Sequence, residues 1–236
     1  MFRSQQLAPL IFVLVLLLGP LITSAGGAAP AVAAAGSAVP VVSTPVQVAG
    51  PSPFRDGCEG APLRSRVYRN SVVEPMLAVD PGDCRRLVAI WQQDRIATSS
   101  SSGVLTAVSD DGGQIWTSSM PAFTRCTGGT ASNGGNYPRA TDPWLAIAPN
   151  GDVYALALAV NAFAGPETTS AMLVSKSLDG GLTWGDPVPL TRDPISAGFN
   201  DKGTITADPF AAQFVYAVWD RDLLAEQTTS GLVEPR

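Results

Sequence analysis

The sequence lacks histidine altogether, and charged residues make up only 15% of its 236 positions. Without histidine, a Ser-His-Asp or Cys-His catalytic set and any His-ligated metal site are excluded. Acid–base chemistry must then fall to Asp, Glu, Tyr or Lys. The formal net charge is −5, so no excess of positive charge is present to neutralise phosphates. We therefore expect no nucleic-acid partner, and we expect neither a cofactor nor a metal.

Cysteine is also scarce, with three residues at Cys58, Cys84 and Cys126. None of them has C-x-x-C spacing, which argues against a zinc site or a thioredoxin-type site. In an exported chain, three cysteines predict one disulfide and one free thiol. We favour the pair Cys58–Cys126, and Cys84, which falls in an expected turn between strands, is the alternative partner.

The first 25 residues have the pattern of a secretory signal peptide. Arg3 lies near the start, residues 7–22 are strongly apolar, and small residues follow. The apolar run is short for a membrane span and contains prolines, although an uncleaved N-terminal anchor is the alternative. We expect a secreted or cell-envelope protein without membrane attachment once the signal is removed. Residues 26–57 are rich in Ala, Pro and Gly and predict a disordered linker.

Two copies of one octapeptide organise the rest of the chain. Residues 109–116 and 177–184 both fit S-x-D-x-G-x-x-W and lie 68 positions apart (109 to 177). Asp can hydrogen-bond the backbone of a turn, and Gly accepts a positive φ, so each copy predicts a hairpin. The Trp is expected as a buried anchor on the returning strand. The motif positions are Ser109, Asp111, Gly113 and Trp116, and then Ser177, Asp179, Gly181 and Trp184.

These octapeptides resemble the Asp box of sialidase-like (BNR-repeat) β-propellers, where the box caps a hairpin between outer strands of a blade. The flanking sequence repeats in step, because residues 142–149 match 74–81 and a third copy begins at residue 201. We therefore predict an all-β fold, a partial β-propeller of about two and a half four-stranded blades. The expected blades are approximately 67–125, 137–192 and 199–236, within an incomplete propeller domain of 58–236. Propellers close with roughly four to eight blades, so missing C-terminal blades or another chain would be needed to close the ring.

Acidic residues stand at the start of each expected blade, namely Glu74, Asp142 and Asp201. The inner strand of a propeller blade lines the central channel. If the three side chains point to the axis, they form a ring of carboxylates that could bind a cation or a sugar, or supply the acid and base for glycoside cleavage. The alternative is that each carboxylate caps nearby backbone N–H groups.

Two arginines and one tryptophan are the candidate substrate-binding residues. Arg95 and Arg221 close the second strands of the first and third expected blades. Their planar guanidinium groups suit a substrate carboxylate, and the alternative is that each pairs with the preceding aspartate and fixes a loop. Trp144 offers either a platform for sugar stacking or blade-to-blade packing.

The sialidase resemblance implies an arginine triad for the sialic acid carboxylate, a Tyr–Glu pair and an Asp acid/base. In that family the first arginine lies in a Tyr/Phe-Arg-Ile-Pro motif. The nearest sequence here, residues 68–71, lacks Ile-Pro, whereas Arg95 resembles the second arginine. The resemblance implies an exported glycoside hydrolase of exo-α-sialidase type that acts on extracellular glycans or glycoproteins. The alternative is a non-catalytic propeller scaffold that binds glycan or protein.

Overall fold

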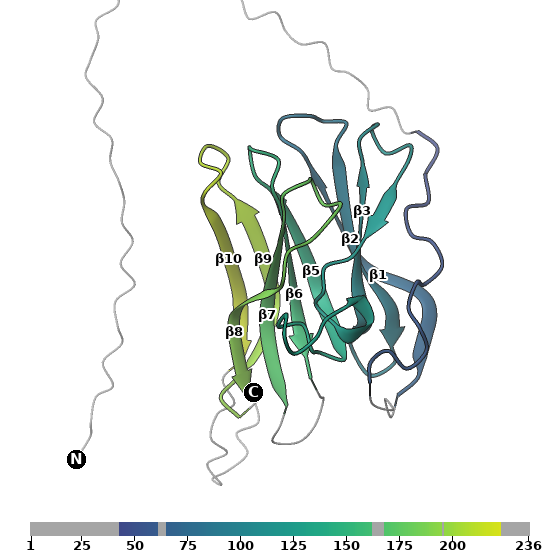
Figure 1. Cartoon of the computed structure of the whole chain (residues 1–236), viewed down its shortest axis with the longest axis vertical. Coiled ribbons are helices and arrows are strands. Elements are labelled where there is room, and N and C mark those ends of the chain that lie inside the picture. Colours follow the sequence, from purple (N-terminus) through teal and green to yellow (C-terminus); the bar gives the residue numbers. More distant parts are fainter. Residues whose placement is uncertain (1–42, 61–64, 162–167, 195, 223–236) are drawn as a thin grey trace, which may run out of the picture. The chain divides into compact units, whose positions relative to one another are not determined.

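The computed structural model describes residues 43–60, 65–161, 168–194 and 196–222 (Figure 1). Regular structure in these ranges is β-strand, apart from one short 3₁₀ helix, η1 (Arg125–Thr127). The strands are β1 (Val67–Val79), β2 (Leu87–Ile96), β3 (Ser101–Ser109), β4 (Thr117–Ser119), β5 (Arg139–Ile147), β6 (Val153–Val160), β7 (Thr169–Ser177), β8 (Val188–Pro194), β9 (Phe199–Ala207) and β10 (Val215–Asp222). No helix within the described ranges is long and apolar enough to cross a membrane. The expected signal peptide, most of the expected linker and the end of the third expected blade lie outside these ranges.

Successive strands pair as antiparallel neighbours and form three repeats, which we call blades. Blade 1 comprises β1–β4 and blade 2 comprises β5–β8, while β9 and β10 begin blade 3. A single bridge between Ser101 and Ala140 links blades 1 and 2. The inner strand β5 contacts both β1 and β9, the inner strands on either side of it (Figure 1). Four-stranded sheets repeated in this way are the architecture of a β-propeller, so the prediction of an all-β, propeller-like fold is confirmed.

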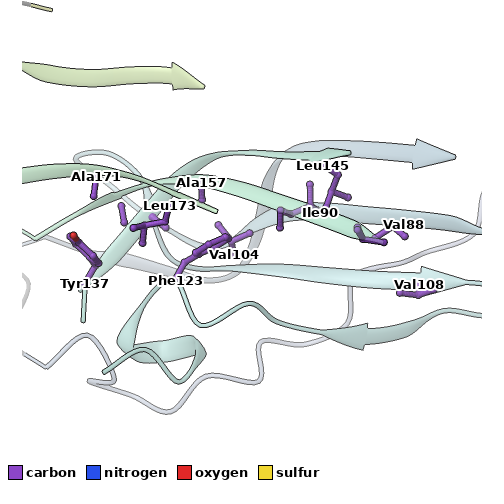
Figure 2. Close-up of a cluster of buried hydrophobic side chains, with 14 residues drawn as sticks. Val88, Ile90, Val104, Val108, Phe123, Tyr137, Leu145, Ala157, Ala171 and Leu173 are labelled. Carbon is purple, nitrogen blue, oxygen red and sulfur yellow. The ribbon is translucent and has the colours of Figure 1, made fainter. Parts of the chain in front are cut away.

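The blades are held together by their apolar faces. Side chains alternate along a strand, so each blade presents two faces. On the face of blade 1 toward blade 2, Val88, Ile90 and Val104 are fully buried. They form one cluster with Leu173 and a row of blade 2 alanines, of which Figure 2 labels Ala157 and Ala171. Because full burial of each large apolar side chain contributes about 1.5–3 kcal/mol, this stacking is a main source of stability.

A second apolar cluster joins blade 2 to the strands of blade 3. Its buried members are Ala146, Leu156, Leu158, Val160, Met172 and Ile205. Trp219 on β10 packs against this cluster and donates its indole N–H to Asn200 Oδ1 (3.1 Å). Blade 2 therefore uses one face toward blade 1 and the other toward blade 3.

The two S-x-D-x-G-x-x-W octapeptides form the turns that follow β3 and β7. In each turn the serine hydroxyl donates to the aspartate (2.8 and 2.7 Å) and accepts from the N–H of the second glycine (2.9 and 2.7 Å). Both glycines of each turn have a positive φ, as the motif requires. Hydrogen bonds from Thr183 and Ser177 lower the pKa of Asp179 to about 2.

The tryptophan of each turn lies before the returning strand and not on it, since β4 begins at Thr117 and β8 at Val188. Both indoles are half-buried. Trp184 Nε1 donates to Ser119 Oγ of blade 1 (3.0 Å), so the second turn ties blade 2 to blade 1. Trp116 packs on the opposite face of blade 1.

Residues 44–60, which we call the strap, correct the prediction of a disordered linker that extends to residue 57. They belong to the same compact unit as the blades. Phe54 is buried with Trp91 and Leu105 on the face of blade 1 that is turned away from blade 2. Gly103 leaves room for this ring, because a Cβ at that position would lie 2.7 Å from Phe54. The buried ring of Phe54 therefore fixes this part of the strap to blade 1.

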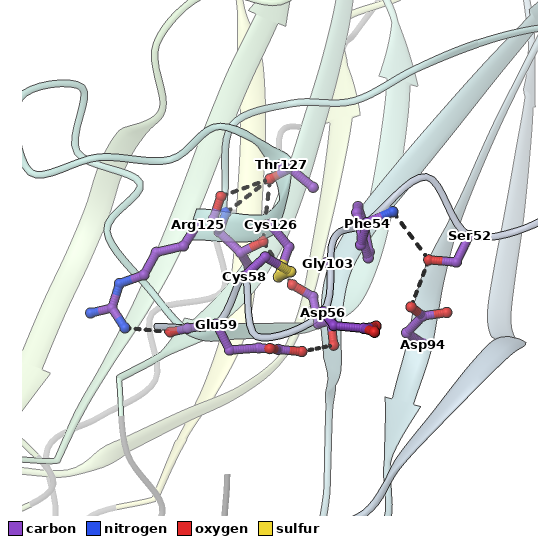
Figure 3. Close-up of a disulfide and its surroundings, with 12 residues drawn as sticks. Ser52, Phe54, Asp56, Cys58, Glu59, Asp94, Gly103, Arg125, Cys126 and Thr127 are labelled. Atoms are coloured by element: carbon purple, nitrogen blue, oxygen red, sulfur yellow. Dashed lines mark hydrogen bonds between the residues drawn. A yellow bond between two sulfur atoms is a disulfide. The ribbon is translucent and has the colours of Figure 1, made fainter. Parts of the chain in front are cut away.

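Polar and covalent links fasten the strap at two more points (Figure 3). Ser52 Oγ donates to Asp94 Oδ2 (2.6 Å), and the Asp94 side chain is fully buried. A disulfide joins Cys58 to Cys126 in η1, and Cys84 is an exposed free thiol. The strap thus covers part of the face that a preceding blade would cover in a propeller.

We predict that replacing Cys58 and Cys126 together by serine lowers the free energy of unfolding by about 2–4 kcal/mol. The disulfide spans 68 residues of sequence, so its loss frees a long loop of the unfolded chain and releases the strap. Urea denaturation measures the change, and Cys84→Ser is the matched control that leaves the midpoint unchanged. An unchanged midpoint in the double variant would show that the disulfide does not stabilise the fold.

Candidate functional site

The three inner strands are distorted at equivalent places. Register shifts interrupt the pairing of β1 with β2 at residues 73–76, of β5 with β6 at residues 141–144, and of β9 with β10 at residues 201–204. The residue at each distortion has a positive φ: Glu74 (52°), Asp142 (49°) and Lys202 (46°). A left-handed backbone at a residue other than glycine costs of order 1–3 kcal/mol, and bulges of this kind redirect side chains. All three residues line one cavity of about 400 Å³.

The structure corrects the predicted alignment of the third repeat. Lys202 occupies the position of Glu74 and Asp142, and Asp201 precedes it by one residue. The predicted ring of three carboxylates is therefore two carboxylates and an ammonium group. Glu74 and Asp142 also lie inside their strands and not at the starts, since β1 begins at Val67 and β5 at Arg139.

Side chains from four strands are tied together around this cavity. Lys202 Nζ lies 2.8 Å from Asp142 Oδ1. Gln92 on β2 is fully buried and donates through Nε2 to Glu74 Oε2. The guanidinium of Arg95 donates through one terminal nitrogen to Gln92 Oε1 (3.0 Å). These two carboxylates therefore accept hydrogen bonds from side chains of neighbouring strands, unlike the local backbone caps of the alternative prediction.

Asp201 lies beside Asp142, where it lines a second cavity of about 250 Å³ together with Glu74, Arg95 and Lys202. Burial raises the pKa of Asp201, and the negative charge of Asp142 raises it further, while Lys202 opposes the shift. Asp142 also forms the ion pair with Lys202. Two neighbouring carboxyl groups in such different surroundings can serve as a proton donor and a proton acceptor.

The structure places the predicted tryptophan and the two predicted arginines in different surroundings. Trp144 lines the first cavity and is 38% exposed, so its ring is open to a ligand. Arg95 lines the second cavity. Arg221 instead forms an ion pair with Asp193 of β8 (2.9 Å). The alternative, in which each arginine pairs with the preceding aspartate, is wrong for both. Asp94 accepts a hydrogen bond from Ser52 of the strap, and Arg221 pairs with Asp193 of β8.

A cation site is not assembled by these carboxylates. Within the ranges that the structure describes, one group of three cysteine or acidic side chains comes close enough to hold a metal ion, namely Cys58, Glu59 and Cys126. Both of these cysteines are consumed by the disulfide. At the candidate site, the ammonium group of Lys202 lies 2.8 Å from Asp142 Oδ1.

Sequence reasoning missed Gln92 and Lys202. Gln92 and Gln93 interrupt an otherwise apolar strand, and this interruption could have indicated a buried polar side chain that holds another residue by a hydrogen bond. The repeat pattern did not predict Lys202 as a site residue, because the third repeat has Lys202-Gly203 where the first two repeats have an acid followed by proline.

No protein-family model and no curated protein matches the chain. Among solved structures, the α-L-arabinanase of Penicillium chrysogenum, complexed with arabinobiose, is 13% identical with a TM-score of 0.39. The match covers 64% of this chain and 40% of the arabinanase. A protein of unknown function from Dyadobacter fermentans DSM 18053 is 13% identical with a TM-score of 0.36, and the match covers 52% of this chain and 38% of that one. The chain thus spans less than half the length of either structure.

We predict opposite shifts of the Asp201 pKa in two variants. Asp142→Asn lowers the pKa of Asp201, because it removes a neighbouring negative charge. Lys202→Met raises it, because it removes a positive charge. Carbon-detected NMR titration of the side-chain carboxyl groups measures both shifts, with the exposed Asp186→Asn as a control that leaves Asp201 unchanged. Equal pKa values in all of these proteins would show that the three side chains are not neighbours.

Proposed function

We propose that this chain is an exported, sialidase-like glycoside hydrolase of exo-α-sialidase type that acts on extracellular glycans or glycoproteins. The observation that carries the proposal is the position of Asp201, with its raised pKa, beside Asp142 and around one cavity with Glu74. Glycoside cleavage requires one carboxylic acid that is protonated at working pH and a second group that is ionised.

In the proposed reaction, Asp201 gives its proton to the glycosidic oxygen as the bond from that oxygen to the anomeric carbon breaks. Glu74 takes a proton from a water molecule whose oxygen bonds to the anomeric carbon, so this proposed single displacement replaces the Tyr–Glu pair that the sialidase resemblance implies. The gain and loss of one proton balance, and Gln92 holds Glu74 in place through its hydrogen bond. Glu74 on β1 and Asp201 on β9 stand on either side of β5, so a sugar between them is flanked by both groups.

Two further residues suit an acidic sugar. Arg95 uses one terminal nitrogen on Gln92, and its remaining N–H groups are available to a substrate carboxylate. The exposed ring of Trp144 in the adjoining cavity can stack on a sugar face. The sialidase-like repeats and an arginine beside a carboxylate pair together support the sialidase type.

Export is supported by two features. The first 25 residues have the charge, the apolar core and the small residues of a secretory signal peptide. The disulfide between Cys58 and Cys126 suits an oxidising compartment.

A second candidate is a non-catalytic propeller that binds glycan or protein. The ion pair between Lys202 and Asp142 favours it, because Lys202 neutralises one of the carboxylates at the cavity. The missing Tyr/Phe-Arg-Ile-Pro motif favours it as well. If the protein binds a glycan but does not hydrolyse it, the non-catalytic function would be the correct one.

We predict that the chain hydrolyses an aryl α-sialoside, and that Asp201→Asn lowers kcat by about a hundredfold or more, because the proton donor is lost. The wild-type rate falls as the pH rises through the pKa of Asp201, since the acid must be protonated. Asp186→Asn, an exposed carboxylate outside both cavities, is the control that keeps full activity. A folded wild type as inactive as Asp201→Asn on a panel of aryl glycosides would remove the enzyme proposal.

A further inference from the structure

The side chains at the end of β2 depart from the alternation of a regular strand, in which successive side chains point to opposite faces. Trp91 and Gln93 lie on the face of blade 1 that carries the strap, and the Trp91 indole N–H donates to Gln93 Oε1 (3.0 Å). Gln92 points to the other face, where it donates to a hydroxyl of β5 in blade 2 (2.9 Å). Regular alternation would then turn Asp94 toward blade 2 and Arg95 toward the strap.

Asp94 reverses this order. Its carboxylate accepts a hydrogen bond from Ser52 of the strap (Figure 3), whereas Arg95 donates to Gln92 on the opposite face. The φ of Asp94 is 60°, and the pairing of β1 with β2 is interrupted opposite it, between residues 68 and 72. Such a bulge redirects the side chains that follow it. The left-handed backbone of Asp94 therefore explains why Arg95 reaches the second cavity.

The end of β10 provides an internal comparison. Arg221 also follows an aspartate, but that aspartate, Asp220, lacks the positive φ of Asp94. The guanidinium of Arg221 pairs with Asp193 of the preceding blade (2.9 Å) and does not line the second cavity. The same pair of residue types thus presents its arginine to the cavity at the left-handed aspartate and to the preceding blade at the other.

The strap helps to hold Asp94 in its conformation. Aspartate and asparagine adopt a positive φ more readily than other residues with a side chain, although it remains uncommon for them. The fully buried Asp94 side chain accepts hydrogen bonds from the backbone N–H of Asn70 (2.8 Å) and from the Gln93 amide (3.0 Å). Its other oxygen accepts from Ser52 (2.6 Å) and lies 3.5 Å from a terminal nitrogen of Arg69. The carboxylate is therefore fixed from the strap, from β1 and from β2.

We propose that Asp94 is a positioning residue, which the strap holds so that Arg95 faces the carboxylate of the substrate. This inference rests on the proposed function, which assigns the substrate carboxylate to Arg95. It adds that recognition of an acidic sugar depends on residues 44–60, although none of them lines either of the two cavities at the site. Disturbing Asp94 should therefore weaken the binding of an acid and leave the binding of an uncharged analogue intact.

A crystal structure of the Asp94→Ala variant tests the positioning without any ligand. Alanine disfavours a positive φ and removes the carboxylate, so we expect Arg95 to turn away from Gln92 and out of the second cavity. Asp94→Asn should keep Arg95 in place, because asparagine tolerates the left-handed backbone. An intact hydrogen bond between Arg95 and Gln92 in the alanine variant would overturn the proposal.

Calorimetric titration with sialic acid and with its methyl ester tests the consequence for binding. We expect Asp94→Ala to lower the affinity for the acid about tenfold or more and to leave the affinity for the ester unchanged, because only the acid needs the guanidinium. Ser52→Ala removes only the contact with the strap and should lower the affinity for the acid about twofold or more. This milder variant decides the matter if Asp94→Ala does not fold, since an unchanged affinity for the acid would overturn the proposal.

Asp111→Ala is the matched control for the loss of a structural aspartate in blade 1. Its side chain accepts hydrogen bonds from its own turn after β3 and lines neither cavity, so the affinity for the acid should stay at the wild-type value. An equal loss of affinity in Asp111→Ala and Asp94→Ala would show a general effect on the fold and would overturn the proposal.

A double variant shows whether Asp94 acts through Arg95. Arg95→Met removes the guanidinium, so Asp94→Ala should lower the affinity for the acid no further in that background. A further loss of the same size as in the single variant would overturn the proposal. If the wild type binds the acid no better than the ester, the proposed sialidase function fails, whereas the crystal structure still decides whether Asp94 directs Arg95.

Discussion

The stacking of one apolar sheet face on the next is the constraint on which the rest of this structure depends. A four-stranded blade cannot bury both of its faces alone, so each needs a neighbour. Blade 2 meets this need on both sides, with its alanine row and Leu173 against blade 1 and with Leu156, Leu158 and Met172 toward blade 3. At the outer face of blade 1, the strap supplies Phe54 in place of a neighbour. The turns after β3 and β7 act at the edges of this stack, where Trp184 bonds the preceding blade.

Stacking also creates the candidate site. Because blades repeat around an axis, their inner strands bring equivalent positions together, and a distortion in each strand redirects one side chain into a common cavity. The chemistry then depends on small departures from the repeat. Lys202 at the third position converts a ring of like charges into an ion pair, and the neighbouring Asp201 is left in surroundings that favour its protonated form. The asymmetry between otherwise similar repeats therefore gives Asp201 surroundings that differ from those of Asp142.

Much of the fold could be predicted from the sequence. A repeated turn with Asp and Gly at fixed positions predicts a hairpin at each copy, and the Trp at fixed spacing marks the outer edge of a blade. Short apolar runs between such turns predict antiparallel strands, and the structure contains them. The strap could not be predicted from composition, since the contacts of Phe54 and Ser52 are with residues about 40–50 positions away, and such long-range contacts leave no local pattern. Residue type and spacing predicted Glu74, Asp142 and Arg95 as candidates, and the structure places all three around one cavity. Lys202 and Gln92 were not predicted, because the third repeat carries a lysine where the first two carry an acid, and because a buried glutamine has no periodic signal.

A double-mutant cycle on Ile90 and Leu145 tests most directly whether apolar faces of successive blades hold the fold together. Both side chains are buried in the cluster between blades 1 and 2, one from β2 and the other from β5. Each change to alanine should lower the free energy of unfolding by about 2–5 kcal/mol. If the two faces pack on each other, the double variant should depart from the sum of the single changes by about 0.5–3 kcal/mol. Small effects that add without any coupling would show that the blades do not stack through these faces, and the account of the fold and of the site would fail together.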